Sequence, residues 1–237
     1  MMDEQQRLLA EVLDLFAQRF DRRAVLRGGM VLRILGCERL TNDLDYVFVP
    51  YRSKKDVVDD VLLALRTLPG VKVSHALNSK CLRVTVDRGS AAIQVEAKTA
   101  LQVAAQTLST GSLARPFNLP PRLIRVVDYP VALADKMAAW NERRLMRDLY
   151  DIWFFLRMGV RPDEAVLARR LRKPEYSRLV KAADHFRGSS VADFRDFLLA
   201  RVQQLTDAGL AAELKDYLRP DELAGLSMRI RAEFAKW

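Results

Sequence analysis

Strand-like runs in this sequence occur only before residue 128, and every periodic segment after Pro130 is helical. The strand-like runs are short and apolar, or alternate apolar and polar residues as half-buried strands do. They cover residues 24–27, 43–49, 81–87, 91–98 and 123–127. The helical segments repeat apolar residues at spacings of three and four. They cover residues 4–20, 30–35, 54–68, 131–143, 146–158, 162–171, 175–185, 191–205, 208–217 and 222–236. The pattern predicts an α/β (α+β) fold, with a mixed sheet lobe over residues 1–128 and an all-helical lobe over residues 129–237.

The composition is that of an ordinary folded protein. A chain of 237 residues that is half apolar can bury a proper core. It lacks the roughly 20 consecutive apolar residues of a membrane span, and its first residues are acidic where a signal peptide is basic. We therefore expect a soluble, cytoplasmic protein that does not contact a membrane. Cys37 and Cys81, like His75 and His185, lack metal-ligand spacing and are interpreted as structural residues, with both thiols reduced.

The chain is basic, with 39 Lys and Arg against 30 Asp and Glu and a formal net charge of +9. A basic excess favours a polyanionic partner such as a nucleic acid or a nucleotide. Many of the basic residues cluster in the second half, either as solvated helix faces or as contacts to an RNA backbone. The clustered residues are Arg143, Arg144, Arg147, Arg169, Arg170, Arg172, Lys173, Arg178 and Lys181.

Two aspartates at the start of one strand are the first candidate site. Asp43 and Asp45 point to the same side of the run DLDYVFV, because strand side chains alternate. Their carboxylates repel each other unless a cation neutralises them, and oxygen ligands of this kind suit Mg²⁺. An isolated D-x-D is more often a pair of exposed turn residues, so this motif depends on its context.

The context is a glycine turn. Gly28 and Gly29 lie between a short strand and a helix start, where backbone N–H groups are free to bind an anion and glycine lets a phosphate approach closely. Met30 follows the second glycine and adds a backbone donor to the same turn. A lone Gly-Gly is a simple tight turn, but together with the nearby D-x-D it predicts a phosphate cradle beside a metal site.

A third carboxylate would complete a site for two metal ions about 3.5–4 Å apart. Glu96 is the first choice, since it lies mid-strand, opposite the apolar face formed by Ile93 and Val95. Asp87 is the rival, although it ends its strand next to Gly89 as a turn residue does.

A P-loop motif is absent from the sequence, which argues against a P-loop NTPase.

These residues resemble a known family. The GG…RLTNDLDY segment of residues 28–46 is similar to motif I of the nucleotidyltransferase superfamily, and more closely to the AbiEii family, the toxins of type IV toxin–antitoxin and phage-resistance systems. That family also carries a helix lysine and an R-D-x-x-D segment. The matching residues here are Lys136, Arg147, Asp148 and Asp151. The resemblance covers about residues 24 to 156 and leaves the last third of the chain unmatched.

The resemblance implies a nucleotidyltransferase-like fold. In that fold the helical lobe would form part of the nucleotide or acceptor site. Asp43 and Asp45 would be metal ligands, with Gly28-Gly29 as the triphosphate cradle. Lys136 would contact the phosphates together with Arg147, and Asp148 would support the nucleotide or the acceptor. Many relatives have Ser or Thr at or just after the second glycine, where this chain has Met30, a difference that bears on nucleotide affinity.

The residues of the helical lobe also have simpler interpretations. Lys136 lies on an otherwise apolar helix, where its ammonium either extends to solvent or meets an anion. Arg147 and Asp151 are four apart and could form an ion pair on a helix surface.

The sequence therefore predicts an Mg²⁺-dependent enzyme that transfers an NMP from an NTP to an acceptor hydroxyl, with two metal ions. The resemblance favours an RNA 3′ end as acceptor, tRNA especially, and implies a cognate antitoxin as partner. A protein hydroxyl is the competing acceptor. Two other classes stay open, namely a catalytically weak module that binds RNA or a partner, and a metal-dependent phosphohydrolase or nuclease.

Overall fold

The computed structural model describes residues 2–175 and 185–237. The chain divides into two compact units, Met1–Asp128 and Tyr129–Trp237, here called the sheet unit and the helical unit. Within the described ranges, no helix is both long and apolar enough to cross a membrane.

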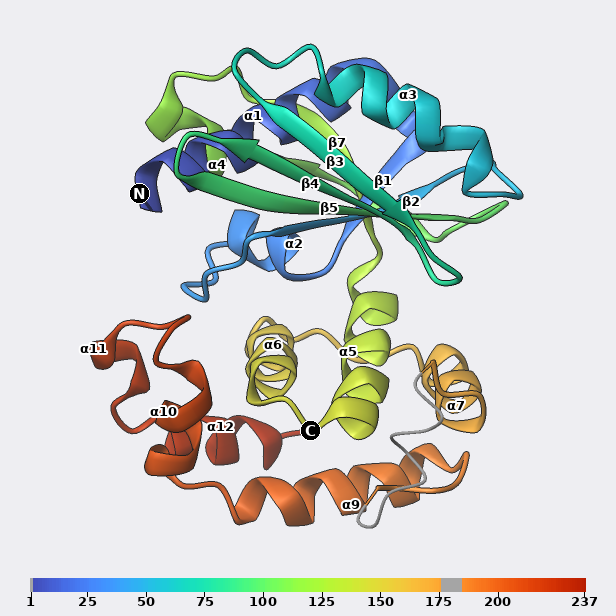
Figure 1. Cartoon of the computed structure of the whole chain (residues 1–237). Coiled ribbons are helices and arrows are strands. Elements are labelled where there is room, and N and C mark those ends of the chain that lie inside the picture. Colours follow the sequence, from blue (N-terminus) through green and yellow to red (C-terminus); the bar gives the residue numbers. More distant parts are fainter. Residues whose placement is uncertain (1, 176–184) are drawn as a thin grey trace. The chain divides into compact units, whose positions relative to one another are not determined.

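The sheet unit is built on one mixed seven-stranded sheet with the order β3-β4-β5-β2-β1-β7-β6 (Figure 1). Its strands are β1 (Ala24–Arg27), β2 (Asp43–Phe48), β3 (Lys72–Leu77), β4 (Leu82–Arg88), β5 (Ala91–Thr99), β6 (Ala105–Ser109) and β7 (Leu123–Val127). The pairs β2–β5 and β1–β7 are parallel, and the other pairs are antiparallel. Strand β2 therefore lies in the middle of the sheet, between β5 and β1.

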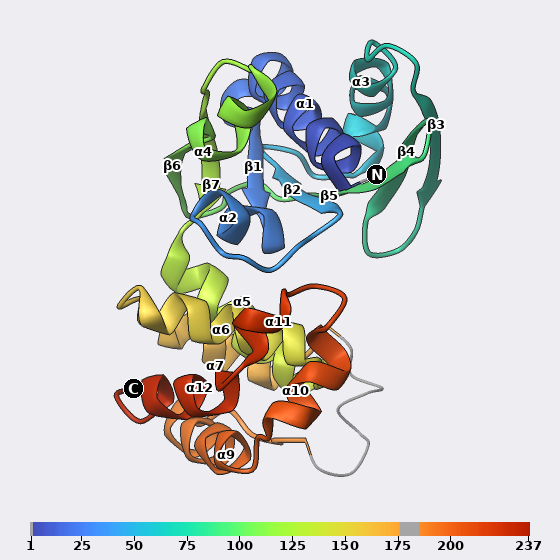
Figure 2. The ribbon, with the colours of Figure 1, turned by 90° about the vertical axis from the view of Figure 1, so that its left-hand side faces the viewer.

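Helices cover both sides of this sheet. The helices of the unit are α1 (Met2–Phe20), α2 (Gly29–Ile34), α3 (Lys55–Leu65) and α4 (Gly111–Ala114), with short 3-10 turns at Asp21–Arg23 and Arg115–Phe117. Figures 1 and 2 show α1 and α3 on one side of the sheet and α2 on the other. Phe16 of α1 packs against Tyr46 and Phe48 of β2, with ring centroids 4.9 and 6.2 Å away. This aromatic contact fixes one face of β2 in the core and turns the alternate residues to the other face.

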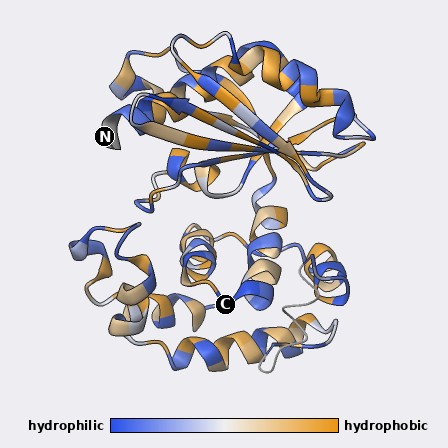
Figure 3. Ribbon diagram, viewed as in Figure 1, coloured by the Kyte–Doolittle hydropathy of each residue, from blue (hydrophilic) through white to orange (hydrophobic). Residues whose placement is uncertain are grey.

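The helical unit holds α5 (Tyr129–Arg143), α6 (Met146–Arg157), α7 (Glu164–Arg172), α9 (Val191–Gln203), α10 (Asp207–Leu214), α11 (Pro220–Leu223) and α12 (Leu226–Phe234). Helix α5 packs against α6 and α7, and α12 packs against α6 and α9. In Figure 3 these helices are striped with apolar and polar residues, as expected when each buries one side. Trp153, Phe155, Phe194 and Phe234 lie in the core that these apolar sides form.

The predicted fold class, a mixed sheet followed by helices, is confirmed, and so are the five predicted strands. Two edge strands, β3 and β6, were not predicted. The helix predicted over residues 222–236 is confirmed over Leu226–Phe234 as α12, but its predicted start is wrong, because Gly225 adopts a left-handed φ of +65° and separates α11 from α12. Residues 176–184, which make up most of the helix predicted over 175–185 and include Arg178 and Lys181, lie outside the described residues.

Candidate active site

Asp43 and Asp45 lie on one face of the central strand β2. Leu44 between them is completely buried, whereas both aspartates are partly exposed. The Asp43 backbone N–H donates to Thr41 Oγ1 over 3.4 Å, which fixes the start of the strand. Because β2 is paired on both sides, the two carboxylates are held on a rigid element, as a precise site requires.

The glycine turn lies directly against the second aspartate. Gly28 has φ +77° and ψ −156°, a conformation that is nearly restricted to glycine. A Cβ atom at this position would lie 2.2 Å from Asp45 Oδ2. Backbone and carboxylate can approach this closely only because residue 28 has no side chain.

The second glycine makes room for two residues that the sequence reasoning gave no role. A Cβ at Gly29 would lie 2.6 Å from Arg39 Nη2 and 3.3 Å from Thr41 Oγ1. Arg39 is only 5% exposed, and its Nη1 donates to the Leu40 carbonyl over 3.1 Å. Both residues belong to the RLTNDLDY motif, and that motif was the sequence signal that could have identified them. Arg39 thus brings a buried positive charge to the glycine turn.

Met30 does not offer its side chain to the turn. It begins the buried side of α2 and is 0% exposed, so only its backbone could contact a phosphate. Helix α2 is six residues long, which makes its dipole a weak contribution. The cradle predicted here therefore depends on the backbone of the turn and on Arg39.

The strand register brings Glu96, and not Asp87, next to the aspartates. Glu96 of β5 is paired in register with Asp45 of β2 on one side and with Arg83 of β4 on the other. Asp87 lies four residues further along β4, about 13 Å from Arg83. Of the two candidate carboxylates, Glu96 alone shares a register position with the site.

Glu96 is held by an ion pair. Arg83 Nη2 lies 2.6 Å and Arg83 Nε 2.9 Å from Glu96 Oε1. The hydrogen bond to Glu96, together with the charges of Glu96 and Asp43, raises the pKa of Arg83. The neighbouring Cys81 thiol is buried, and this burial, followed by the negative charge of Glu96, raises its pKa.

The oxygen donors of Asp43 and Asp45 fit a hard divalent cation. Mg²⁺ typically takes one or two carboxylates and completes its shell with waters and substrate phosphates, and the Gly28 backbone of the turn lies directly against Asp45. Across the described residues there is no cluster of three His, Cys, Asp or Glu side chains placed to hold a metal ion. Glu96, whose carboxylate is paired with Arg83, remains a prediction as the third ligand.

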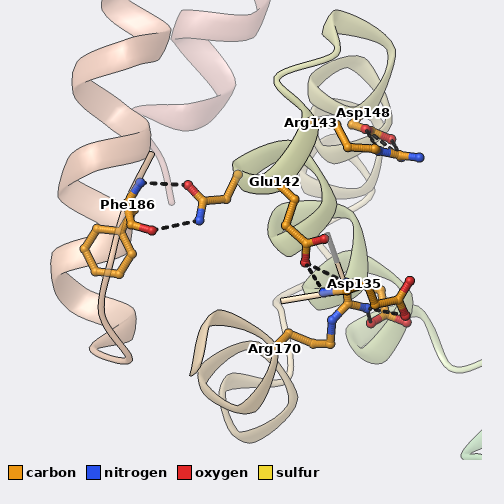
Figure 4. A network of polar contacts seen from close by, with 8 residues as sticks. Asp135, Glu142, Arg143, Asp148, Arg170 and Phe186 are labelled. Atoms are coloured by element: carbon orange, nitrogen blue, oxygen red, sulfur yellow. Dashed lines mark hydrogen bonds and ion pairs between the residues drawn. The ribbon is translucent and has the colours of Figure 1, made fainter. Parts of the chain in front are cut away.

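The helical unit contains a separate, buried cluster of charges. Lys136 Nζ of α5 lies 2.6 Å from Asp151 Oδ2 and 3.6 Å from Asp148 Oδ1. Arg143 donates to both oxygens of Asp148, as Figure 4 shows. The side chain of Asp148 is 1% exposed and that of Asp151 is 0% exposed. Lys136 thus meets anions supplied by the protein itself, and the predicted surface pair between Arg147 and Asp151 is wrong, because Asp151 is buried and pairs with Lys136.

Other polar residues of α5 hold its neighbours in place. Arg170 of α7 binds Asp135 at 2.7 Å and the buried Glu142 at 3.1 Å. The Asn141 side chain binds both the N–H and the carbonyl of Phe186 (Figure 4). Two members of the predicted basic clusters, Arg143 and Arg170, are therefore engaged in internal ion pairs.

Comparison with known proteins identifies the family. A family model described as "Nucleotidyl transferase AbiEii toxin, Type IV TA system" matches residues 7–232. No curated protein sequence matches the chain. Among solved structures, the nucleotidyltransferase toxin MenT4 (Rv2826c) of Mycobacterium tuberculosis H37Rv is similar, with a TM-score of 0.60 and 20% identity, covering 98% of this chain and 83% of that one.

Two structures from Helicobacter pylori have the same fold. JHP933 matches with a TM-score of 0.57 and 13% identity, over 98% of this chain and 90% of the other. A protein described as a putative nucleotidyltransferase matches with a TM-score of 0.53 and 13% identity, over 98% and 92%. The predicted nucleotidyltransferase-like fold is thereby confirmed. The family match shows that this chain is a nucleotidyltransferase belonging to the AbiEii toxin family of type IV toxin–antitoxin systems, which implies an NTP substrate and an antitoxin partner.

Proposed function

We propose that this nucleotidyltransferase is Mg²⁺-dependent and transfers an NMP from an NTP to the 3′ hydroxyl of an RNA, with tRNA as the favoured acceptor. The acceptor oxygen bonds to the α-phosphorus, the bond from that phosphorus to the bridging oxygen breaks, and pyrophosphate leaves. The observation that carries the proposal is the Asp43–Asp45 pair, on one face of a central strand and against the bare Gly28 backbone.

In this proposal the sheet unit provides the chemistry. Asp43 and Asp45 hold the cation, which when bound neutralises phosphate charge and orients the reacting oxygens. The Gly28 and Gly29 turn, with the Met30 backbone, positions the triphosphate. Glu96, which is in register with Asp45, is in this proposal the third carboxylate and accepts the proton of the acceptor hydroxyl.

In this proposal the helical unit contributes the residues that match the family motif. Lys136 and Arg147 supply positive charge for the phosphates, and Asp148 supports the nucleotide or the acceptor. Lys136 is 18% exposed and lies between two buried carboxylates, so its ammonium is held in place before a substrate arrives.

An RNA acceptor is preferred on the basis of charge. The chain carries a net charge of +9, and arginines on the outside of the helical unit, such as Arg169 and Arg172, are exposed. An RNA backbone is the polyanion that such a surface favours. A protein hydroxyl is the competing acceptor.

The test is transfer of label from each α-³²P NTP, supplied separately, to total cellular RNA with Mg²⁺. Three proteins are compared: the wild type, the double variant Asp43→Asn/Asp45→Asn, and Asp87→Asn as the control. Asp87 lies on the same sheet but away from the site, so its substitution makes the same chemical change without touching the proposed chemistry.

We expect an RNA band labelled with one NTP by the wild type and by Asp87→Asn, and no label with the double variant. Label on a protein would replace RNA as the acceptor, and shortened RNA would indicate a nuclease. Absence of label with every NTP would contradict the proposal and favour a module that only binds.

A further inference from the structure

The Arg83–Glu96 ion pair lies on the same sheet face as the two site aspartates. Along one register row the sheet carries Asp45, Glu96 and Arg83 on three adjacent strands. Paired residues on neighbouring strands project to the same side, about 5 Å apart. The Arg83 guanidinium therefore lies beside Glu96, two strands from Asp45, and Arg27 of β1 is paired with Asp45 on the other side of the row.

The pair leaves its arginine accessible. The Arg83 side chain is 49% exposed and that of Glu96 is 24% exposed, while both guanidinium donors reach a single oxygen, Oε1. Ion pairs this exposed contribute little free energy, and they open easily. Strands β4 and β5 do not need the pair to stay together, because their other face is buried through Leu82, Val84 and Val95.

The charges explain why an arginine is placed here. Three carboxylates on one sheet face repel one another, and a fixed cation next to them reduces that repulsion. The charge of Asp43 acts on Arg83 along with that of Glu96. An arginine keeps its charge at every physiological pH, so it can occupy the place of a cation before any metal arrives.

We propose that Arg83 controls whether Glu96 takes part in metal binding. With the pair closed, Glu96 is held by Arg83 and does not bind the cation that Asp43 and Asp45 hold. When the pair opens, Glu96 joins them, and the half-exposed guanidinium turns to the triphosphate or the RNA backbone. This inference rests on the proposed function, and it makes Arg83 a positioning residue that acts through Glu96.

The test measures Mn²⁺ binding, in the absence of nucleotide, by the electron paramagnetic resonance signal of the free ion. The variants are Arg83→Gln, Glu96→Gln and the double variant Arg83→Gln/Glu96→Gln. Lys72→Gln on the edge strand β3 is the control for the loss of one positive charge. Circular dichroism and thermal unfolding check that each variant is folded.

We expect Arg83→Gln to bind Mn²⁺ about fivefold more tightly than the wild type, the factor that opening a half-exposed ion pair allows. In the Glu96→Gln background the same substitution should have no such effect, and Lys72→Gln should bind like the wild type. An equal gain with and without Glu96 would show a simple charge effect and overturn the proposal, as would an unchanged affinity in Arg83→Gln.

Asp45→Asn separates this inference from the function on which it rests. If wild-type protein binds Mn²⁺ and Asp45→Asn does not, the metal site stands, and the result for Arg83 decides the inference alone. If Asp45→Asn binds Mn²⁺ as the wild type does, the metal site and the inference fail together.

Discussion

The two units of this protein each present a pair of aspartates, and they treat these pairs in opposite ways. Asp43 and Asp45 lie on a strand, partly exposed, against a glycine backbone. Asp148 and Asp151 lie on a helix with almost no exposure and are neutralised by Lys136 and Arg143. The same side chain thus occurs in a partly exposed setting that suits a ligand and in a buried setting with ion pairs.

The difference that the structure shows is the exposure of the carboxylates to solvent. Buried carboxylates are tolerated when they are paired and hydrogen-bonded, and such a pair is costly to break. Partly exposed carboxylates remain solvated and can exchange water for a cation. We therefore expect substitutions in the strand pair to affect activity, and substitutions in the helix pair to affect stability first.

The largest effect is expected from Asp45→Asn. Loss of one metal-binding carboxylate should lower the transfer rate about 10³-fold, because the lost charge stabilisation amounts to several kcal/mol. The thermal unfolding midpoint should change little, since the residue is partly exposed. A rate measured with labelled NTP at saturating Mg²⁺ checks this, and a rate close to the wild type would remove Asp45 from the site.

The next largest effect is expected from Asp151→Ala in the helical unit. It leaves the Lys136 ammonium without its 2.6 Å partner in a mostly buried position, which should lower the free energy of unfolding by about 3 kcal/mol. Denaturant unfolding measures this loss. The double variant Lys136→Met/Asp151→Leu removes both charges and should recover most of the stability, whereas equal losses in both proteins would show that the ion pair itself is unimportant.

A smaller effect is expected from Gly28→Ala, which tests the contact between the turn and Asp45. The substitution forces an unfavourable backbone conformation and places a methyl group against Asp45 Oδ2, at a cost of about 1–3 kcal/mol together with a loss of activity. Gly36→Ala is the matched control, because Gly36 also has a positive φ, of +92°, but its Cβ would meet no atom within 4 Å. It should lose stability and keep activity. Equal activity in the two variants would argue against a site at the turn.

The smallest effect concerns a carboxylate outside both pairs. The backbone N–H of Ser227 donates to Asp207 Oδ1 over 2.8 Å and, as the main cause, lowers the pKa of Asp207. The ionised form is favoured in the folded state, so this stability is present above the unfolded pKa of about 4 and is lost as the pH falls through the folded value. Between neutral and acid pH, the thermal unfolding midpoint should therefore fall less in Asp207→Asn than in the wild type. An identical decrease in both proteins would contradict this role.

The sequence predicted the central strands and most helices because each buries one side in a regular period. It did not predict β3 and β6, which form the two edges of the sheet. Five of the six residues of β3 are exposed, so that strand has no apolar alternation to detect. Hydrogen bonding to β4 holds it in place, and such pairing leaves no pattern in the sequence of one strand.

The candidate site was predictable only in part. Asp43 and Asp45 share a face because of local geometry, which the sequence alone determines. The position of Glu96 beside Asp45, and of Arg83 beside Glu96, depends on the register between strands far apart in the chain. Similarly, the pairing of Asp151 with Lys136 in place of Arg147 depends on how α5 packs against α6.

The parallel pairing of β2 with β5 has a consequence for the order of folding. The segment between these strands contains α3, β3 and β4, so the pair joins distant parts of the chain and closes a long loop. Contacts of this kind are slow to form compared with the local β3–β4 and β4–β5 hairpins. A growing polypeptide therefore exposes Asp43 and Asp45 well before it can align them with Glu96, and this alignment forms late in folding.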